Sequence, residues 1–433
     1  MIDKMATLTH TTSMQTRFRA FGPLLEQKLR KPFVHIVFGA RQTGKSTLIR
    51  SLVPDTATIL DLSDPRERSR FAANPGLFLD LCRSLPPLEG GRIVWIDEAQ
   101  TVPALFDAVQ HLYDSDKERW RFILCGSSAR RLRSSGANLL PGRSLRHILH
   151  PLLNVEYEAD PRQPLPASGR LLPFGVADPD ARLPLPRFPR RSLENRLVFG
   201  DLPGIALLDT DEDRADLLES YATAFLEEEI RRETLLKDWG HFLRFLKFAA
   251  GESGGIVNLS NISRETGVSS QTIKGYYQLL EDMFMGFFVP AFSGSRRKTV
   301  LSSPRFFFFD LGVRNAAAGI PLVEATVNAI AGSLFEQWVG IQLWRKLSYT
   351  KAGTLSYYRT TDGAEVDFIL ELETEIIPLE VKWTENPNLK DVRHLSSFIA
   401  THAPRCTRGY LITRCPYVLS LTDTVTALPW WAL

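Results

Sequence analysis

The stretch KPFVHIVFGARQTGKSTLIRSL, residues 31–52, constrains the fold more than any other part of the chain. It passes from an apolar run through a glycine-bounded loop into a segment with helical patterning. Within it, Gly39, Gly44, Lys45 and Ser46 match the pattern G-x-x-x-x-G-K-[ST] in the strand, loop and helix setting that the pattern requires. We therefore expect an α/β fold at this end of the chain.

The loop predicts a binding site for the phosphates of ATP. Glycines let consecutive backbone N–H groups turn toward phosphate oxygens at a helix N-terminus, while Lys45 would neutralise the outer phosphates and the Ser46 hydroxyl would bind Mg²⁺. The alternative, a glycine-rich turn with a surface lysine, is disfavoured by the flanking strand and helix. The expected nucleotide-binding residues are Gly39, Ala40, Arg41, Gln42, Thr43, Gly44, Lys45, Ser46 and Thr47.

Two acids follow the next strongly apolar run, GRIVWIDEAQ at residues 91–100. Ligands of open α/β sheets bind at the carboxyl ends of the strands, where Asp97 and Glu98 are expected to lie. Asp97 would hold Mg²⁺ through water, and Glu98 would orient or deprotonate the attacking water. An apolar run that ends in two acids is often only a strand leaving the core, but a preceding phosphate loop favours the magnesium site.

A third apolar run, RFILCGSS, ends at Ser127 and Ser128. Their hydroxyls are placed where a γ-phosphate or its attacking water could be sensed. The alternative is a helix cap before the residues ARRLR.

Together these stretches resemble an ATPase domain of the AAA superfamily, in the group of prokaryotic ATPases that carries a C-terminal domain of uncharacterised function. The resemblance covers residues 33–150 and rests on FGARQTGKST, ILDLSDP, WIDEAQTVPALFDAVQHLYD, ILCGSSARRL and LLPGRSLRHILHPL. It implies a homo-oligomer, such as a hexameric ring, in which an arginine of one subunit reaches the neighbour's nucleotide. Arg143 is the first candidate and Arg130 the second, because a guanidinium stabilises charge on transferring phosphoryl oxygens. An ordinary surface arginine is an equal alternative.

The middle of the chain predicts a winged helix-turn-helix. After a helical segment, a short helix near 261–266, a turn at Gly267 and a helix from about Ser269 to Asp282 precede two strand-like runs. The second helix would enter a DNA groove and the hairpin tip would contact phosphates, although such modules also bind proteins. The candidate DNA-binding residues are Gln271, Thr272, Lys274, Arg296, Arg297 and Lys298.

Residues 363–383, GAEVDFILELETEIIPLEVKW, predict an antiparallel hairpin with its loop at Glu373-Thr374. Like charges directly opposite each other destabilise a sheet, so two opposed acids would need a cation or solvent to offset their repulsion. The register pairs Val366 with Val381, Phe368 with Leu379 and Leu370 with Ile377 on an apolar face, and Asp367 with Glu380 and Glu365 with Lys382 on the other.

Residues 330–400 resemble the restriction-endonuclease-like superfamily, whose signature is an aspartate followed by Glu/Asp-x-Lys. The resemblance implies that Asp367 and Glu380 bind magnesium and that Lys382 orients the attacking water or stabilises charge. Glu336 would be the acid on the preceding helix, and Glu365, outside the motif, would pair with Lys382. The alternatives are a domain that binds DNA without cutting it and a domain with a structural or partner-binding role.

The chain of 433 residues, with a net charge of +3 and 44% hydrophobic residues, indicates a globular protein of several domains. The cysteines show no metal or disulfide spacing, and no signal peptide or membrane span is evident, so we expect a cytoplasmic protein without a membrane partner. We expect an N-terminal arm at 1–30, a P-loop AAA-type ATPase domain at 31–158, a Pro-rich linker at 159–190, a helical and winged-helix domain at 191–310, and a restriction-endonuclease-like α/β domain at 311–433.

Two functions fit these patterns. The first is an Mg²⁺-dependent ATPase that binds, remodels or processes DNA and carries a metal-dependent nuclease domain. The second is a nucleotide-switched signalling or defence regulator whose C-terminal domains bind a protein partner and do not cut DNA.

Overall fold

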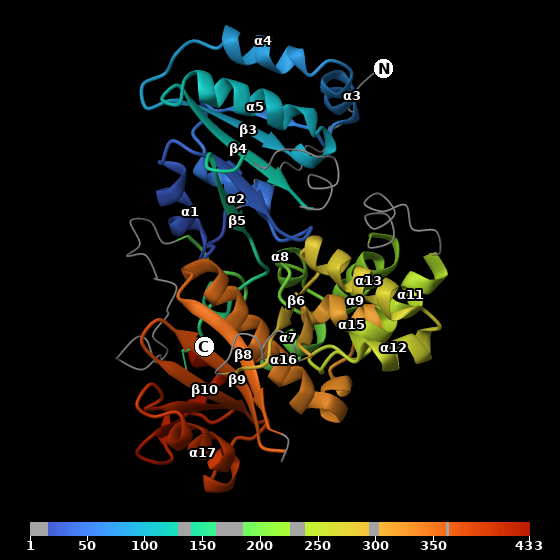
Figure 1. Ribbon diagram of the computed structural model, residues 1–433, viewed down its shortest axis with the longest axis vertical. Coiled ribbons are helices and arrows are strands. Elements are labelled where there is room, and N and C mark those ends of the chain that lie inside the picture. The colour runs from blue at the N-terminus through green and yellow to red at the C-terminus, as the bar shows by residue number, and fades with distance from the viewer. Residues whose placement is uncertain (1–15, 129–139, 162–184, 226–238, 294–302, 361–362) are drawn as a thin grey trace, which may run out of the picture.

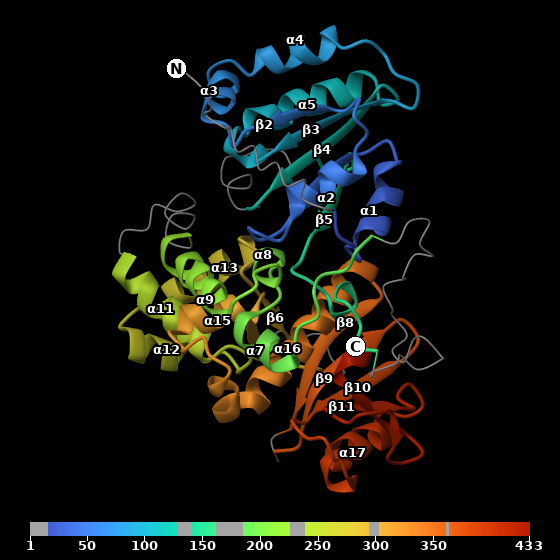
Figure 2. The ribbon, with the colours of Figure 1, turned by 180° about the vertical axis from the view of Figure 1, so that it is seen from behind.

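The computed structural model describes residues 16–128, 140–161, 185–225, 239–293, 303–360 and 363–433. Figure 1 shows three groups of elements: an N-terminal sheet with its helices at the top, a helical group to one side, and a C-terminal sheet below. The view from behind in Figure 2 keeps the same arrangement. Of the residues predicted from the sequence, Arg130, Arg296, Arg297 and Lys298 lie outside the described ranges.

The N-terminal sheet has five strands in the order β2-β3-β4-β1-β5, and every neighbouring pair is parallel. The carboxyl ends of all five strands therefore meet at one edge, as the sequence predicted for the phosphate loop and the acids. The elements are α1 (Gly22–Leu29), β1 (Val34–Phe38), α2 (Lys45–Leu52), β2 (Thr58–Asp61), α3 (Pro65–Ala73), α4 (Gly76–Ser84), β3 (Arg92–Asp97), η1 (Ala99–Thr101), α5 (Ala104–Ser115), β4 (Trp120–Gly126) and β5 (Ser144–Ile148).

Helices cover both faces of this sheet, because alternate residues of its strands point to opposite sides. Val34, Ile36 and Phe38 of β1 pack in one core with side chains of α4 and α5. Val37 of the same strand packs in a second core with side chains of α1 and α2. This double burial explains why the strands read as continuous apolar runs.

The middle group is mainly helical and contains the predicted helix-turn-helix elements. Ser269 caps the second of these helices by accepting from Thr272 N–H at 3.2 Å, and Gly267 ends the first in the left-handed conformation. The turn η2 (Asn154–Glu156) follows the N-terminal sheet. The elements of the middle group are α7 (Leu193–Phe199), α8 (Pro203–Ala206), α9 (Asp211–Ser220), the π-helical turn η3 (Tyr221–Phe225), α11 (Trp239–Gly251), α12 (Leu259–Thr266), α13 (Ser270–Asp282), β6 (Gly286–Val289), β7 (Arg305–Phe308) and α15 (Leu311–Ala318). Strands β6 and β7 pair antiparallel.

The C-terminal sheet has six strands in the order β12-β13-β11-β10-β9-β8. The predicted hairpin register is confirmed near the loop, since Phe368 lies opposite Leu379 and Leu370 opposite Ile377. The elements are α16 (Ala325–Thr350), β8 (Gly353–Arg359), β9 (Glu365–Leu372), β10 (Ile376–Val381), η4 (Leu389–Val392), α17 (Arg393–Thr401), β11 (Gly409–Thr413), β12 (Leu419–Ser420), β13 (Val425–Pro429) and η5 (Trp430–Ala432).

A β-bulge in β9 corrects one part of the predicted hairpin. Ser356 of β8 lies opposite Ile369 and Tyr358 opposite Val366, so two residues of β9 oppose Tyr357 alone. The extra residue shifts the alternation of side chains. Val366 therefore packs in the core beneath α17, whereas Phe368 packs in the core with α16. The expectation that Val366 shares the face of Phe368 was wrong. The bulge depends on how β9 pairs with β8, and the hydrophobic pattern of a short strand does not indicate it.

One hydrophobic core runs from Leu193 to Leu433 and crosses the predicted boundary between residues 310 and 311. Where the two predicted domains meet, Phe287 of β6 stacks on Trp344 of α16 with ring centroids 3.9 Å apart. The core also includes Ala40 of the phosphate loop. The middle group and the C-terminal sheet are therefore packed as one body.

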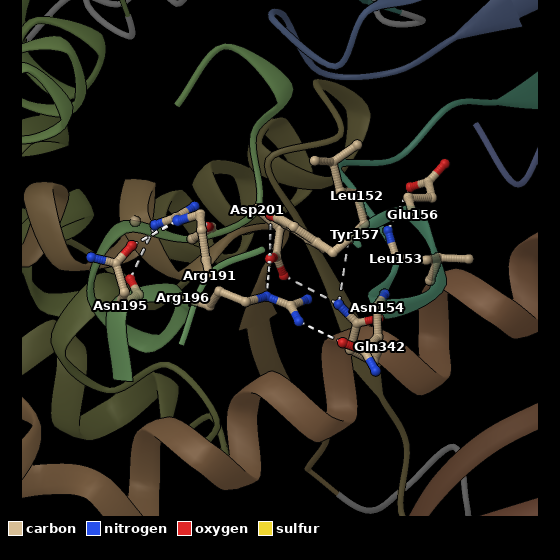
Figure 3. A network of polar contacts seen from close by, with 12 residues as sticks. Leu152, Leu153, Asn154, Glu156, Tyr157, Arg191, Asn195, Arg196, Asp201 and Gln342 are labelled. Carbon is tan, nitrogen blue, oxygen red and sulfur yellow. Dashed lines mark hydrogen bonds and ion pairs between the residues drawn. The ribbon is translucent and has the colours of Figure 1, made fainter. Parts of the chain in front are cut away.

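Buried polar side chains join the three parts of the chain (Figure 3). Asp201 accepts hydrogen bonds from Tyr157 at 3.0 Å and Gln342 at 3.2 Å, and pairs with Arg196 at 2.8 Å and Arg345 at 3.3 Å. Burial alone would raise the pKa of Asp201, but the two guanidinium groups outweigh it and lower the pKa. The carboxylate is therefore charged and is held by residues from all three parts. Across the described ranges, we find no helix with the length and apolar character needed to cross a membrane.

Candidate functional site

The loop between β1 and α2 has the geometry of a phosphate cradle. Gly39 has φ = +151° and Gly44, the N-cap of α2, has φ = +85°. A side chain at Gly39 would also meet the carbonyl oxygen of Leu149 at 2.3 Å. Both positions therefore require glycine, and the loop delivers the chain into the N-terminus of α2, where backbone N–H groups are unpaired.

Lys45 is buried inside this loop. Its Nζ donates to the carbonyl oxygens of Gly39 at 2.8 Å and Ala40 at 2.9 Å. Burial lowers the pKa of Lys45, while the nearby charge of Glu98 opposes the shift. The ammonium group is thus held at the loop by weak neutral partners, which a phosphate oxygen can replace with a stronger charge-assisted bond.

The two predicted magnesium ligands lie in contact. The Ser46 hydroxyl donates to Asp97 Oδ2 at 2.6 Å. Burial raises the pKa of Asp97, and the Ser46 hydrogen bond partly offsets the rise. A hydroxyl and a carboxylate oxygen at the end of a buried strand are oxygen ligands of the kind that Mg²⁺ prefers. The pair therefore fits this ion.

Glu98 follows β3 in the left-handed conformation, with φ = +52°. Its Oε2 accepts a hydrogen bond from Gln100 Nε2 at 2.6 Å, and the same amide group donates to Ser127 Oγ at 3.1 Å. The predicted water-activating acid and the predicted phosphate sensor are therefore joined by one side chain. Sequence reasoning missed Gln100, because the contact depends on a neighbouring strand.

A second group of charged residues lies where the C-terminal sheet meets β7 and α16. Arg305 donates to Glu336 at 2.8 Å and also to Glu365. Lys382 pairs with Glu380 at 2.8 Å. The expected pair of Glu365 with Lys382 is therefore wrong, because Arg305 of β7, distant in sequence, takes Glu365. We call these residues, together with Asp367, the acidic cluster.

Three carboxyl groups of the acidic cluster, Glu336, Asp367 and Glu380, resist ionisation. Burial, followed by the charge of Asp367, raises the pKa of Glu380 to about 8 and that of Glu336 to about 7. The pKa of Asp367 is also raised by burial, although the N–H of Val381 donates to it at 2.8 Å. Among the described residues, no group of three or more His, Cys, Asp or Glu side chains is arranged to hold a metal ion. A metal ligand set that included Glu336 would need this side chain to leave Arg305.

Comparison with known families decides the nature of the N-terminal part, since a family model described as an AAA domain matches residues 31–158. Residues 31–158 form a P-loop ATPase domain. Models of two domains of unknown function, DUF8612 and DUF4143, match residues 190–324 and 331–433. The family match and the loop geometry together support nucleotide hydrolysis by the ATPase domain.

Known proteins resemble the chain over most of its length. It is 25% identical to an uncharacterized protein of Mycobacterium tuberculosis (strain ATCC 25618 / H37Rv) over 408 residues, which are 94% of this chain and 82% of that protein. It is 23% identical to an uncharacterized protein of Haemophilus influenzae over 379 residues, 84% of this chain and 86% of that protein. A solved structure, the Walker-type ATPase of Pyrococcus abyssi, has a TM-score of 0.44 and 14% identity and covers 70% of this chain and 97% of that one.

The predicted arginine finger lies away from the nucleotide edge of the ATPase domain. Arg143 precedes β5, and its carbonyl accepts from the N–H of Val34 at the start of β1, so it stands at the amino ends of the strands. Its guanidinium pairs with Asp114 at 2.6 Å on the surface. An arginine that serves a neighbouring subunit must point away from its own site, so this position leaves the predicted role open.

The predicted groove-contacting residues of α13 are accessible. Gln271, Thr272 and Lys274 are all exposed, whereas Ile273 and Tyr277 on the same helix are buried in the shared core. The helix thus presents a polar face near its N-terminus while its apolar face packs inside.

Proposed function

We propose that this protein is an Mg²⁺-dependent ATPase that acts on DNA. The observation that carries the first part is the contact of Ser46 with Asp97 at 2.6 Å beside the buried Lys45. These groups lie at the carboxyl edge of a parallel sheet, where the glycine loop offers backbone N–H groups to phosphates.

Each residue has a separate role in hydrolysis. Lys45 neutralises charge on the outer phosphates, and Ser46 and Asp97 would hold Mg²⁺, which supplies further charge neutralisation when bound. Glu98 orients the attacking water and accepts its proton. Its left-handed conformation, with φ = +52°, carries a strain that is typical of functional positions.

The part of the proposal that concerns DNA is supported by the exposed N-terminal end of α13, which offers Gln271, Thr272 and Lys274. Such side chains contact base edges and phosphates when a recognition helix lies in the major groove. Ala40 of the phosphate loop and Tyr277 of α13 belong to one hydrophobic core. This continuity supports communication between DNA binding and nucleotide turnover.

Stimulation of ATP hydrolysis by DNA tests this proposal. The hydrolysis rate is measured with Mg²⁺ in the absence of DNA and with single-stranded, duplex and branched DNA at two salt concentrations. We expect stimulation that weakens at high salt and is reduced in Lys274→Ala, with Lys117→Ala as an exposed control on the ATPase domain. Equal rates with and without every DNA would contradict it, and co-purification of a protein partner with tightly retained nucleotide would favour a nucleotide-switched regulator.

We further propose that subunits assemble into a ring in which Arg143 serves the neighbouring nucleotide. The ion pair with Asp114 would have to open for this contact. Arg143→Ala should then slow hydrolysis only under conditions where the chain is oligomeric, as judged by light scattering.

A second candidate function is metal-dependent cleavage of DNA at the acidic cluster. Glu380 Oε2 is buried and lacks a hydrogen-bond partner among the described residues, and its carboxylate lies within Coulombic reach of Asp367. Glu336, Glu365, Asp367 and Glu380 outnumber Arg305 and Lys382 by four charges to two, so one divalent cation would balance the fully ionised cluster. Asp367 and Glu380 would hold the ion, and Lys382 would orient the attacking water.

Cleavage is tested by incubating plasmid, linear and branched DNA with the wild-type protein, Asp367→Asn and the exposed control Glu373→Gln in Mg²⁺ or Mn²⁺. Cleavage by wild type and the control, but not by Asp367→Asn, is the expected result. Intact DNA in all reactions would contradict cleavage. The remaining interpretations would then be a domain that binds DNA without cutting it and a domain with a structural role.

A further inference from the structure

Gln100 connects two functional side chains of the ATPase domain. It lies in the 3₁₀ turn η1, two residues after Glu98, and is 4% exposed. Its amide nitrogen donates one hydrogen bond to Glu98 Oε2 at 2.6 Å and another to Ser127 Oγ at 3.1 Å. The two N–H groups of one amide thus have separate acceptors, one after β3 and the other after β4.

The sheet brings these three residues together. Strands β3 and β4 lie side by side and run parallel (Figure 1), with Ile96 opposite Leu124. Glu98 and Ser127 directly follow these strands and therefore both lie at the carboxyl edge. Strand β4 also pairs with β1, and Gly126 lies opposite Phe38, the residue before the phosphate loop. Ser127 therefore stands between the loop and the water-activating acid.

The amide of Gln100 packs against Gly126 of β4, where a side chain would collide with it. A side chain at Gly126 would meet Gln100 Oε1 at 2.6 Å, although Gly126 itself has no unusual backbone conformation. Gln100 Oε1 is buried and has no hydrogen-bond partner among the described residues. A buried unpaired acceptor costs about 1–3 kcal/mol, so the position of this side chain is poorly explained by stability alone.

The direction of the two hydrogen bonds matters for chemistry. Because Ser127 Oγ accepts from Gln100, its own hydroxyl proton is available for donation to a phosphate oxygen. Because Gln100 binds only one oxygen of Glu98, the other carboxylate oxygen remains available to the attacking water. The reverse orientation of the amide would place its oxygen against the Glu98 carboxylate, which charge repulsion disfavours.

We propose that Gln100 is a positioning residue that ties the orientation of Glu98 to the contact between Ser127 and the γ-phosphate of ATP. When Ser127 donates to that phosphate, its oxygen stays fixed as an acceptor for Gln100, and Gln100 in turn fixes Glu98 toward the water. With a nucleoside diphosphate, this restraint on Ser127 is absent. This inference rests on the proposed function of Glu98 as the water-activating acid.

Kinetics of the full-length chain test the proposal. Gln100→Met keeps the length of the side chain and removes both hydrogen bonds. We expect kcat to fall about tenfold to a hundredfold, because small displacements of a reacting group cost factors of this size. The KM for ATP and the dissociation constant of ADP should stay within about threefold, since the two hydrogen bonds that the Gln100 amide forms among the described residues go to Glu98 and Ser127 and not to the phosphate loop. Gln27→Met, an exposed change of the same kind on α1, should leave all three constants unaltered.

A double-mutant cycle separates positioning from a merely structural role. If Gln100 acts on Glu98 together with Ser127, then Ser127→Ala and Gln100→Met should not be additive, and the double variant should be no slower than about the slower single variant. Full additivity, or an unchanged kcat in Gln100→Met, would overturn the proposal. Loss of the thermal unfolding transition in Gln100→Met would also overturn it, because the residue would then be needed for the fold.

The outcomes also distinguish failure of this inference from failure of the proposed function. An active wild type, an inactive Glu98→Gln and a fully active Gln100→Met would reject only the role of Gln100. Wild-type turnover that is unaffected by Glu98→Gln would reject the assignment of Glu98, and with it both proposals.

Discussion

The charged side chains at the phosphate loop and those of the acidic cluster differ in their partners. In the ATPase domain, Lys45 donates to two loop carbonyls and Asp97 accepts from the Ser46 hydroxyl, and neither side chain forms an ion pair among the residues that the structure describes. In the acidic cluster, by contrast, Glu336 and Glu380 are each paired with a base. The ATPase site is therefore ready for a charged ligand, whereas the acidic cluster must first release a partner or a proton.

The acidic cluster predicts a specific dependence of stability on pH. The pKa of Glu380 is raised from 4.5 in the unfolded chain to about 8 in the fold, so the folded state holds an extra proton between these values. The free energy of unfolding should therefore fall as pH rises from about 4.5 to about 8, because unfolding then releases the proton that the folded state holds on Glu380. Chemical denaturation of Glu380→Gln should show a smaller fall than that of wild type.

Glu373→Gln, an exposed change in the hairpin loop, is the matched control and should follow wild type. Added Mg²⁺ or Mn²⁺ at pH 8 should raise the stability of wild type more than that of Glu380→Gln if the cluster binds a divalent cation. Parallel pH curves for wild type and Glu380→Gln would show that burial does not hold a proton on this residue.

At the scale of elements, contiguous patterns were predictable and contacts between distant elements were not. The phosphate loop and the pairing of Phe368 and Leu370 in the hairpin depend on short contiguous segments, and both agree with the structure. The bulge in β9 and the pairing of Arg305 with Glu336 and Glu365 depend on neighbouring strands and on α16. The sequence could not indicate them, since β7 and β9 are far apart along the chain.

Asp201, next to α7, joins elements that the sequence places in three domains. Asp201→Asn keeps the shape of the side chain and removes the charge that balances Arg196 and Arg345. We expect a loss of about 3–5 kcal/mol in the free energy of unfolding, because the buried guanidinium of Arg196 loses its counter-charge and that of Arg345 keeps only Asp310 at 3.5 Å. Urea denaturation measures the change, with Asp216→Asn on the exposed side of α9 as a control that should alter stability by less than about 0.5 kcal/mol. Similar small effects of both variants would contradict a central role for Asp201.

At the scale of the molecule, the helical group and the C-terminal sheet share one core that includes Phe287 and Trp344. The ATPase domain rests on this body through Ala40 of its phosphate loop and through the Tyr221 hydroxyl, which donates to the carbonyl of Arg41 at 3.4 Å. Tyr221 belongs to a π-helical turn, an element that often occurs at functional positions. A movement of the loop on nucleotide binding would therefore displace Tyr221 and the hydrophobic core that Ala40 shares with α13.

The shared core predicts that the chain cannot be divided at residues 310 and 311. A fragment of residues 311–433 would expose the apolar surface that β6, β7, α7 and α11 cover in the intact protein. We expect this fragment to aggregate or to unfold without cooperativity in thermal denaturation followed by circular dichroism. A soluble fragment with a sharp unfolding transition would show that the boundary separates two independent domains.

The most direct test of the central claim is the rate of ATP hydrolysis by Glu98→Gln compared with wild type at saturating Mg²⁺, alongside the ATP dissociation constant of each. The predicted result is ATP binding within about threefold of wild type and turnover at least about a hundredfold slower, since a general base contributes factors of this order. Turnover by Glu98→Gln at the wild-type rate would contradict the account.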